Sequence, residues 1–377
     1  MLHWYDRFFR RSGLSGLLLV LIVTISLFNG CAVGPDYVRP TAEAPDTYKE
    51  IGTWKQAEPQ DHLVRGAWWK IFNNPELNAL EEQVNISNQN VATAEAQFRQ
   101  ALALVQVARA GYFPTVTAGA SATRAFTSYN TPSAIKGTTA DTYLAPLTAS
   151  WAPDVWGRVR RSVEAGAASA QASGALLESV RLLTQAQVAQ DYFQLRMLDA
   201  QKKLLDETTT AYQTSLKLTQ NRYASGIASS ADVLQAETLL KSTQAQAIDI
   251  GVQRAQLEHA IALLLGKPAS LFSIPVAPLG AVPPAIPVGV PSELLERRPD
   301  IAAAERNMAA ANAQIGVAVS AYYPTVTLSG TAGYQSSELS NWLTWPSRLW
   351  SLGAGISETV FEGGLRRAQT AAARAAY

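Results

Sequence analysis

The chain has 377 residues, only 16% of them charged, and a formal net charge of +1. It carries neither the basic excess typical of nucleic-acid binding nor an acidic tract that would collect cations. One cysteine excludes an intrachain disulfide, and the three histidines lie far apart without metal-ligand spacing. No phosphate-binding loop or nucleophile elbow is present, so the composition predicts a protein without enzymatic activity, metal or cofactor.

Residues 1–30 resemble a bacterial lipoprotein signal peptide. Three arginines precede an apolar run from Leu14 to Phe28, which is short for a membrane span. Small Gly30 then precedes Cys31, the position at which such signals are cleaved and acylated. A covalent lipid on Cys31 is therefore expected. The alternative is an ordinary secretory signal followed by an incidental cysteine.

Residues 31–71 are expected to form an extended segment with little helix, because four prolines interrupt it. An internal repeat follows. Tyr112–Thr117 returns as Tyr322–Thr327, and Val155–Arg161 resembles Val360–Arg367. Such a repeat indicates one structural unit built twice.

The repeat sets the expected domain boundaries: a first unit at 72–267, a Pro-rich linker at 268–299 and a second unit at 300–377. The offset between Arg161 and Arg367 places the end of a complete second unit near residue 474, about 97 residues beyond Tyr377. The sequence thus predicts a chain that is incomplete at its C-terminus.

Short strands are predicted at about 113–126, 142–152, 324–335 and 348–360, where apolar and small polar residues alternate. About ten residues suffice for a tilted strand to cross a bilayer, and one apolar face is typical of a membrane β-barrel. An ordinary soluble sheet with one wet face is the alternative. Four strands cannot close a barrel, so in a membrane several chains must share one. Turns between strands and helices are expected at Pro114, Pro153, Gly157, Pro324, Gly363 and Gly364.

A long helical hairpin is predicted over 158–265, because proline is absent from Arg158 to Tyr223 and a heptad repeat follows. In the first helix, apolar residues recur at Leu176, Val180 and Leu183, then at Val188, Tyr192 and Leu195. In the second, one series contains Val233, Leu240, Ala247 and Ile261, with polar Arg254 among them, and the other contains Ala236, Thr243, Ile250, Leu257 and Leu264. Both patterns are also explained by structural packing alone.

At the hairpin tip, Gly226 is expected to end the first helix in a left-handed conformation. Ser229 is expected to cap the second helix, with Asp232 at its third position. Arg222 and Tyr223 complete the candidate site at the tip. Local capping alone would account for Ser229 and Asp232.

The tip sequence Arg-Tyr-x-x-Gly-x-x-Ser-x-x-Asp-Val-Leu is similar to the hairpin motif of the outer-membrane factor family, the TolC-like ducts of tripartite efflux pumps. The remaining motifs are similar to motifs of the same family, and the first of them resembles the mature N-terminus of its NodT-type lipoprotein branch. They are Cys31–Tyr37, the tryptophan-containing stretch Trp68–Leu77, Glu293–Ile301 and the Phe-x-Gly-Gly motif at Phe361–Gly364.

This resemblance implies an α+β membrane protein that acts as a passive outer-membrane duct for drugs or other small toxic compounds. Each protomer of a homotrimer would give four transmembrane strands to a twelve-stranded β-barrel and long antiparallel coiled-coil helices to a periplasmic α-barrel. The implied partners are a periplasmic adaptor (membrane fusion) protein and an inner-membrane transporter of the resistance-nodulation-division type. The lipid-anchored protein would lie in the outer membrane of a Gram-negative bacterium and extend into the periplasm.

The same resemblance makes Asp232 the candidate periplasmic gate, with Arg222, Tyr223, Gly226 and Ser229 as its neighbours. Two other functions fit the sequence. One is a type I protein-secretion duct of the same architecture, which neighbouring genes would distinguish. The other is a non-channel envelope lipoprotein with a coiled-coil scaffold role, which solubility without detergent would support.

Overall fold

The computed structural model describes residues 32–39, 66–130, 132, 136–277 and 298–377. The predicted signal peptide, Cys31 and most of the Pro-rich linker lie outside these described residues. The chain divides into two compact units. The first comprises Met1–Ala42, Gln100–Gln171 and Glu305–Tyr377, and the second comprises Glu43–Arg99 and Ala172–Ala304.

Helices and strands alternate along the chain in the order that the repeat implies. The helical elements are η1 (Trp68–Phe72), α2 (Pro75–Ser87), α3 (Gln89–Ala110), α4 (Arg158–Ala224), α5 (Ser230–Leu264), η2 (Ala269–Leu271), α7 (Pro299–Ser320), η3 (Leu339–Asn341), η4 (Trp345–Ser347) and α8 (Leu365–Ala376). The strands are β1 (Thr115–Ala118), β2 (Ser121–Phe126), β3 (Thr139–Trp151), β4 (Thr325–Ser336) and β5 (Arg348–Ser357).

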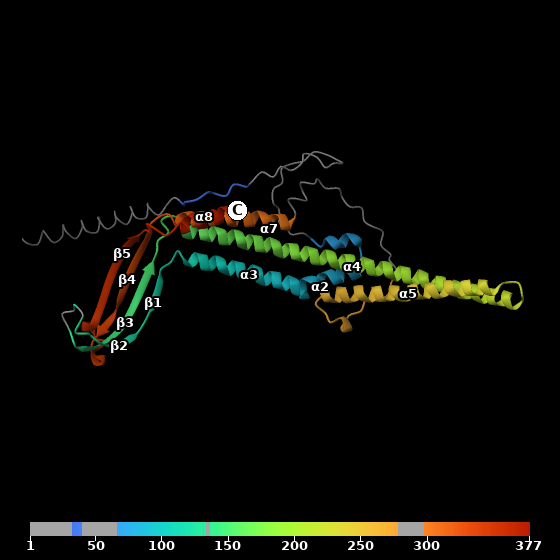
Figure 1. Ribbon diagram of the computed structural model, residues 1–377, viewed down its shortest axis with the longest axis horizontal. Helices are drawn as coiled ribbons and strands as arrows, with labels where there is room; N and C mark the ends of the chain where they lie inside the picture. Colours follow the sequence, from blue (N-terminus) through green and yellow to red (C-terminus); the bar gives the residue numbers. More distant parts are fainter. Residues whose placement is uncertain (1–31, 40–65, 131, 133–135, 278–297) are drawn as a thin grey trace, which may run out of the picture. The chain divides into compact units, whose positions relative to one another are not determined.

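All strands belong to one antiparallel sheet in the first unit, with the order β1-β3-β4-β5, and β2 also pairs with β3 (Figure 1). The two copies of the repeat meet where β3 pairs with β4, from Tyr143 opposite Ser336 to Trp151 opposite Leu328. The sheet therefore brings together strands that are far apart in the sequence.

The first predicted strand, 113–126, is divided into β1 and β2. The register is the same on both sides of the gap, because Ala118 lies opposite Leu147 and Ser121 lies opposite Leu144. Across the gap, the Gly119 N–H donates to the Pro146 carbonyl oxygen over 3.0 Å. Proline has no N–H to return that bond, so the ladder is interrupted there.

Three other boundaries also differ from the predicted ranges. The second strand begins at Thr139 instead of 142, and the last ends at Ser357 instead of 360. Trp68–Phe72, expected to be extended, forms a 3-10 helix in which Trp69 is buried. Burial of a large aromatic ring there outweighs the extended preference of the proline-rich residues before it.

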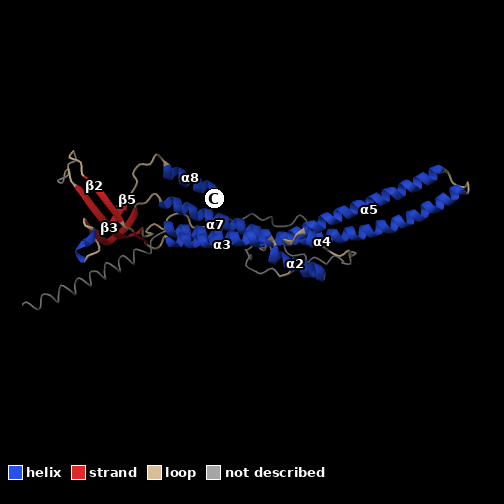
Figure 2. Cartoon of the chain, turned by 90° about the horizontal axis from the view of Figure 1, so that it is seen from below, coloured by secondary structure: helices blue, strands red, loops and turns tan. Residues whose placement is uncertain are grey.

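In the second unit, α4 and α5 run side by side as an antiparallel hairpin (Figure 2). The predicted heptad of α5 is confirmed, because every residue of both series is buried or half-buried. In α4 the prediction is wrong for Leu176 and Leu183, which are 48% and 66% exposed. Leu177 is buried instead, since a spacing of three and four residues fits two adjacent stripes of a helix equally well.

The largest apolar core lies at the base of this hairpin, where α2 packs on α4 and α5. Its fully buried members are Leu77, Val84, Val188, Leu195, Ile261 and Leu265. Each such side chain contributes about 1.5–3 kcal/mol through removal from water. The base of the hairpin is therefore fixed by packing, whereas Tyr223 and Ile227 at its tip are 51% and 70% exposed.

Candidate functional site

Strand pairing places apolar residues on one face of the sheet. Ala118 lies opposite Leu147, and Leu147 lies opposite Ala332. Ala332 in turn lies opposite Trp350. Because directly paired residues point to the same side of a sheet, this row forms part of a continuous apolar face. Trp350 and Leu352 are 75% and 80% exposed, which is typical of a surface that meets lipid or another protein.

The opposite face carries small polar side chains. Thr117 lies opposite Thr148, and their hydroxyl oxygens are 2.7 Å apart, within hydrogen-bond distance. Thr148 pairs with Thr331, which pairs with Ser351. One face is thus suited to hydrocarbon and the other to water, the alternation found in membrane β-barrels.

Both edges of this sheet are open within the described residues: β1 and β2 pair only with β3, and β5 pairs only with β4. An unpaired edge presents a row of N–H and C=O groups that can pair with another strand. In hydrocarbon such groups must be paired, at a cost of several kcal/mol each if they are not. The sheet is therefore suited to pairing with further strands at both edges.

The six predicted turn residues all lie between strands and helices. Pro114 and Pro324 directly precede β1 and β4, Pro153 and Gly157 lie between β3 and α4, and Gly363 and Gly364 lie between β5 and α8. The three glycines have φ values of 78°, 62° and 89°, in the left-handed region that other residues rarely adopt. Sequence reasoning missed Asp154, whose carboxylate accepts from the backbone N–H groups of Val159 and Arg160 over 2.8 Å.

The hairpin tip closes with two capping motifs. Gly226 has φ = 71°, and its N–H donates to the Tyr223 carbonyl oxygen over 2.9 Å. The Ile227 N–H donates to the Arg222 carbonyl oxygen over 2.8 Å. These two bonds form the Schellman motif, so Gly226 ends α4 as predicted.

Ser229 and Asp232 form a reciprocal capping box at the start of α5. The Asp232 N–H donates to the Ser229 hydroxyl, while Asp232 Oδ2 accepts from the Ser229 N–H over 2.8 Å. The backbone and hydroxyl hydrogen bonds from Ser229 lower the pKa of Asp232 below its usual value, and the Arg222 charge acts in the same direction. Asp232 is therefore ionised at neutral pH and faces solvent at the tip.

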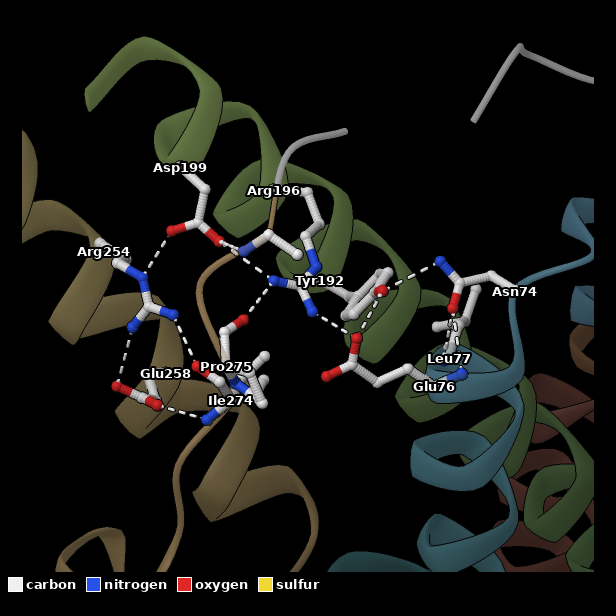
Figure 3. A network of polar contacts seen from close by, with 11 residues as sticks. Asn74, Glu76, Leu77, Tyr192, Arg196, Asp199, Arg254, Glu258, Ile274 and Pro275 are labelled. Carbon is white, nitrogen blue, oxygen red and sulfur yellow. Dashed lines mark hydrogen bonds and ion pairs between the residues drawn. The ribbon is translucent and has the colours of Figure 1, made fainter. Parts of the chain in front are cut away.

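A polar network that the sequence did not predict lies near the base of the hairpin (Figure 3). Asp199 of α4 is only 1% exposed, and its two carboxylate oxygens bind Arg254 over 2.6 Å and Arg196 over 3.0 Å. Arg196 also pairs with Glu76 of α2. The one signal in the sequence was Arg254, the single charged residue within the heptad seam of α5.

The same network fixes the backbone that leaves η2. Arg196 donates to the Pro275 carbonyl oxygen over 2.6 Å, and Arg254 donates to the Ile274 carbonyl oxygen over 2.7 Å. The Ala277 N–H donates to Asp199 over 3.2 Å. Four segments of the chain therefore meet at two arginines, which holds the hairpin base and the start of the linker together.

Glu81 of α2 is an unusual member of the same unit, because it is fully buried. Neither of its carboxylate oxygens has a hydrogen-bond partner within the described part of the chain. Burial in these surroundings raises the pKa of Glu81 to about 8, so the side chain is mainly neutral at pH 7.

The family model described as outer membrane efflux protein matches residues 80–267 and 290–377, which include the hairpin and every strand of the sheet. The chain belongs to the outer membrane efflux protein family. Nodulation protein T of Rhizobium leguminosarum bv. trifolii is 30% identical over 358 residues, which cover 92% of this chain and 74% of the relative. The outer membrane protein OprJ of Pseudomonas aeruginosa is 29% identical, with 96% and 75% covered.

Solved structures agree with this family. The outer-membrane channel OprN has a TM-score of 0.82 and 32% identity, and the match covers 92% of this chain and 77% of that one. The MtrE channel of Neisseria gonorrhoeae in its open state has a TM-score of 0.73 and 27% identity, with 92% and 76% covered. The fold is therefore that of TolC-like outer-membrane channels, an α+β architecture.

Membership in the outer membrane efflux protein family places the chain in the outer membrane of a Gram-negative bacterium as the channel component of an efflux system. Relatives in this family are components of multi-protein efflux pumps, so partner proteins are implied. Among the described residues, no helix has the length and apolar character needed to cross a membrane. In the same residues, no group of three or more His, Cys, Asp or Glu side chains could hold a metal ion.

Proposed function

We propose that the chain is one protomer of a homotrimeric passive duct through which drugs or other small toxic compounds leave the cell. The observation that carries this proposal is the sheet with one apolar face and two open edges. Closure of a barrel needs about eight strands or more, which one copy of this sheet cannot supply. Three copies, paired edge to edge from β5 to β1 and β2, would make a closed barrel of about twelve strands.

In this proposal the α4–α5 hairpin forms part of a periplasmic tunnel, and its tip is the periplasmic mouth. The exposed charge of Asp232, with Arg222 and Tyr223 beside it, suits a polar contact that opens and closes. A periplasmic adaptor protein would bind the tip. An inner-membrane transporter of the resistance-nodulation-division type would supply the energy.

A lipid on Cys31 would add a second attachment to the outer membrane. The lipoprotein-like signal before Cys31 supports this part of the proposal. Mass spectrometry of the N-terminal peptide from the membrane fraction tests it: acyl chains on Cys31 are expected, and an unmodified cysteine in the mature protein would contradict it.

The duct itself is tested by purification of the full chain in detergent and reconstitution into planar bilayers. Trimers in sedimentation experiments and discrete conductance steps are the expected results. A protein that remains monomeric, and that gives no conductance in any detergent or lipid mixture, would contradict the proposal. The variants Leu352→Arg, on the apolar face of β5, and Ser351→Arg, on its polar face, serve as the matched pair for membrane insertion.

A further inference from the structure

Residues Ala32–Tyr37 form what we call the N-terminal strap, which lies on helices of the first unit. The Val33 N–H donates to the Trp156 carbonyl oxygen over 3.2 Å. Asn312 of α7 donates to the Pro35 carbonyl oxygen over 3.0 Å, and the Tyr37 hydroxyl donates to Glu305 of the same helix over 3.2 Å. The strap therefore contacts both the turn before α4 and α7, at Glu305 and Asn312.

Arg161 makes polar contacts with three residues of the strap. Its side chain is only 5% exposed, and its guanidinium lies 2.6 Å from Asp36. It also donates to the carbonyl oxygens of Val33 and Gly34 over 3.3 and 3.4 Å. Glu164, 2.8 Å away on α4, holds the guanidinium in this orientation. A buried arginine that binds two backbone carbonyls and a carboxylate of one segment fixes the path of that segment.

Close backbone contacts also hold the strap on this path. Gly34 has φ = 95°, and a Cβ atom at this position would lie 2.4 Å from the Gly316 Cα atom. A Cβ atom on Gly157 would lie 2.8 Å from the Ala32 Cα atom. Side chains at these glycines would push the strap away from α7 and from the turn before α4.

The second copy of the repeat has the same turn, but no described segment lies against it as the strap lies against Gly157. The offset that relates the copies places Gly363 at the position of Gly157 and Arg367 at the position of Arg161. Gly363 has no atom of the structure within 4 Å of its Cβ position, and Arg367 is exposed. Gly316 corresponds to Gln106, whose longer side chain would block an equivalent approach. The strap is therefore held by Gly157 and Arg161 of the first copy and by Gly316 of the second, and the corresponding residues Gly363, Arg367 and Gln106 do not provide the same contacts.

We propose that Arg161 is the positioning residue for the lipid-bearing N-terminus, and that it fixes where the acyl chains of Cys31 enter the membrane. This rests on the acylation proposed above. The strap brings Ala32, the residue after Cys31, against Gly157. Beside this turn, the Trp156 ring stacks on Tyr323 at a centroid distance of 4.8 Å, and its Nε1 donates to the Pro324 carbonyl oxygen over 2.7 Å.

This location suits a lipid anchor. Tryptophan and tyrosine side chains gather at membrane–water interfaces. Trp156 follows the end of β3 and Tyr323 precedes the start of β4, so both lie between the sheet and the helices. The lipid anchor and the strands are two attachments of one chain to the membrane. If the anchor is held next to the strands, insertion of either one raises the effective concentration of the other at the membrane. A strap that was free to move would lose this advantage, because the anchor would then sample a large volume.

A spin label on Cys31 tests the proposal. Because Cys31 is the only cysteine, the full mature chain exported behind a non-lipoprotein signal carries one unacylated thiol to label. In the parent protein, a slow component in the electron paramagnetic resonance spectrum and slow amide exchange at Val33 are expected. Arg161→Gln is expected to abolish both, Arg161→Lys to retain part of the slow component, and Arg160→Gln, at the exposed neighbour, to retain all of it.

Gly316→Gln provides a second test that keeps arginine at position 161 and copies the residue of the other repeat. A Cβ atom at Gly316 would lie 2.8 Å from the Arg161 Cγ atom, so this variant displaces the Arg161 side chain together with the strap. It is expected to release the strap while amide exchange within α4 and α7 stays at parent values. If the label at Cys31 moves equally in the parent, Arg161→Gln and Gly316→Gln, the proposal is overturned. The labelled protein is not acylated, so this outcome is independent of whether Cys31 carries lipid in the cell.

Discussion

The Nε atom of Arg254 lies 2.6 Å from the Oδ1 atom of Asp199, and this ion pair joins α5 to α4 at the base of the hairpin. Asp199 is shared with Arg196, so one buried carboxylate balances two guanidinium groups, together with Glu76 and Glu258 at the ends of the network. Removal of one member leaves the others charged and without a full set of partners.

Asp199→Ala is therefore expected to destabilise the hairpin base by about 3–5 kcal/mol, the usual cost of breaking a buried ion pair on one side. Thermal unfolding in detergent, followed by circular dichroism, measures the effect. Asp206→Ala is the matched control, because the Lys202–Asp206 pair on the same helix is 38% and 55% exposed. That change is expected to cost less than about 1 kcal/mol. Equal losses in both variants would argue against a special role for the network.

Glu81 predicts a pH dependence of stability. The folded chain keeps Glu81 protonated up to about pH 8, whereas its ordinary pKa is 4.5. The unfolded state binds fewer protons between these values, so stability falls as pH rises from about 4.5 to 8. The full loss is on the order of 5 kcal/mol.

The variant Glu81→Gln should remove this part of the pH dependence. Melting temperatures of the parent and the variant are expected to agree near pH 4.5 and to diverge above it, with Glu81→Gln more stable at pH 8. Glu82→Gln, at the exposed neighbour, should follow the parent curve. Parallel curves for the parent and Glu81→Gln over this range would show that Glu81 ionises normally in the folded state.

An arginine on β5 is expected to affect membrane insertion differently on the two faces of the sheet. Leu352→Arg places a charge in the middle of β5 on the apolar face and is expected to reduce insertion by about 2–4 kcal/mol, the cost of arginine at the bilayer midplane. Ser351→Arg places the same charge on the polar face and should insert normally. Floating of liposomes in a density gradient measures both. If Ser351→Arg inserts less well than Leu352→Arg, the assigned faces are reversed.

Variants at the hairpin tip of the reconstituted duct can separate two roles of Asp232, capping of α5 and gating of the mouth. Asp232→Asn removes the charge that would draw cations to the periplasmic mouth, so the cation preference should fall. Ser229→Ala removes the cap, at about 1 kcal/mol, but keeps the carboxylate and should keep that preference. The lowered pKa of Asp232 means that the preference should persist as the pH falls until it is below the ordinary pKa of 3.8. Equal selectivity in parent and Asp232→Asn would limit Asp232 to capping.

Features that depend on neighbours in the sequence could be predicted. The seam of α5 follows from a seven-residue period, and the tip follows from Gly226 and Ser229, because both are decided within a few residues of one helix. The choice between Leu176 and Leu177 could not be made in this way. Their positions differ by one residue in a helix whose partners, α2, α3 and α5, come from other parts of the chain.

Features that depend on register or on several elements could not be predicted. The interruption between β1 and β2 needs Pro146 to lie opposite Gly119, which is known only when both strands are paired. The arginine network draws on α2, α4, α5 and the residues after η2, and each contributes a residue type that is ordinary on a helix surface. The burial of Glu81 was equally hidden, since Glu81 and Glu82 look alike in the sequence.

The interruption at Pro146 has a consequence for the shape of the sheet. Gly119 lies on one side of Pro146, and Gly333 lies opposite it on β4, where a Cβ atom would come within 2.2 Å of the Ala145 carbonyl oxygen. Two glycines and a proline thus form a line across three strands, with one ladder bond missing. Glycines and lost pairing are the means by which a sheet is curved. This line is therefore where the sheet bends most easily.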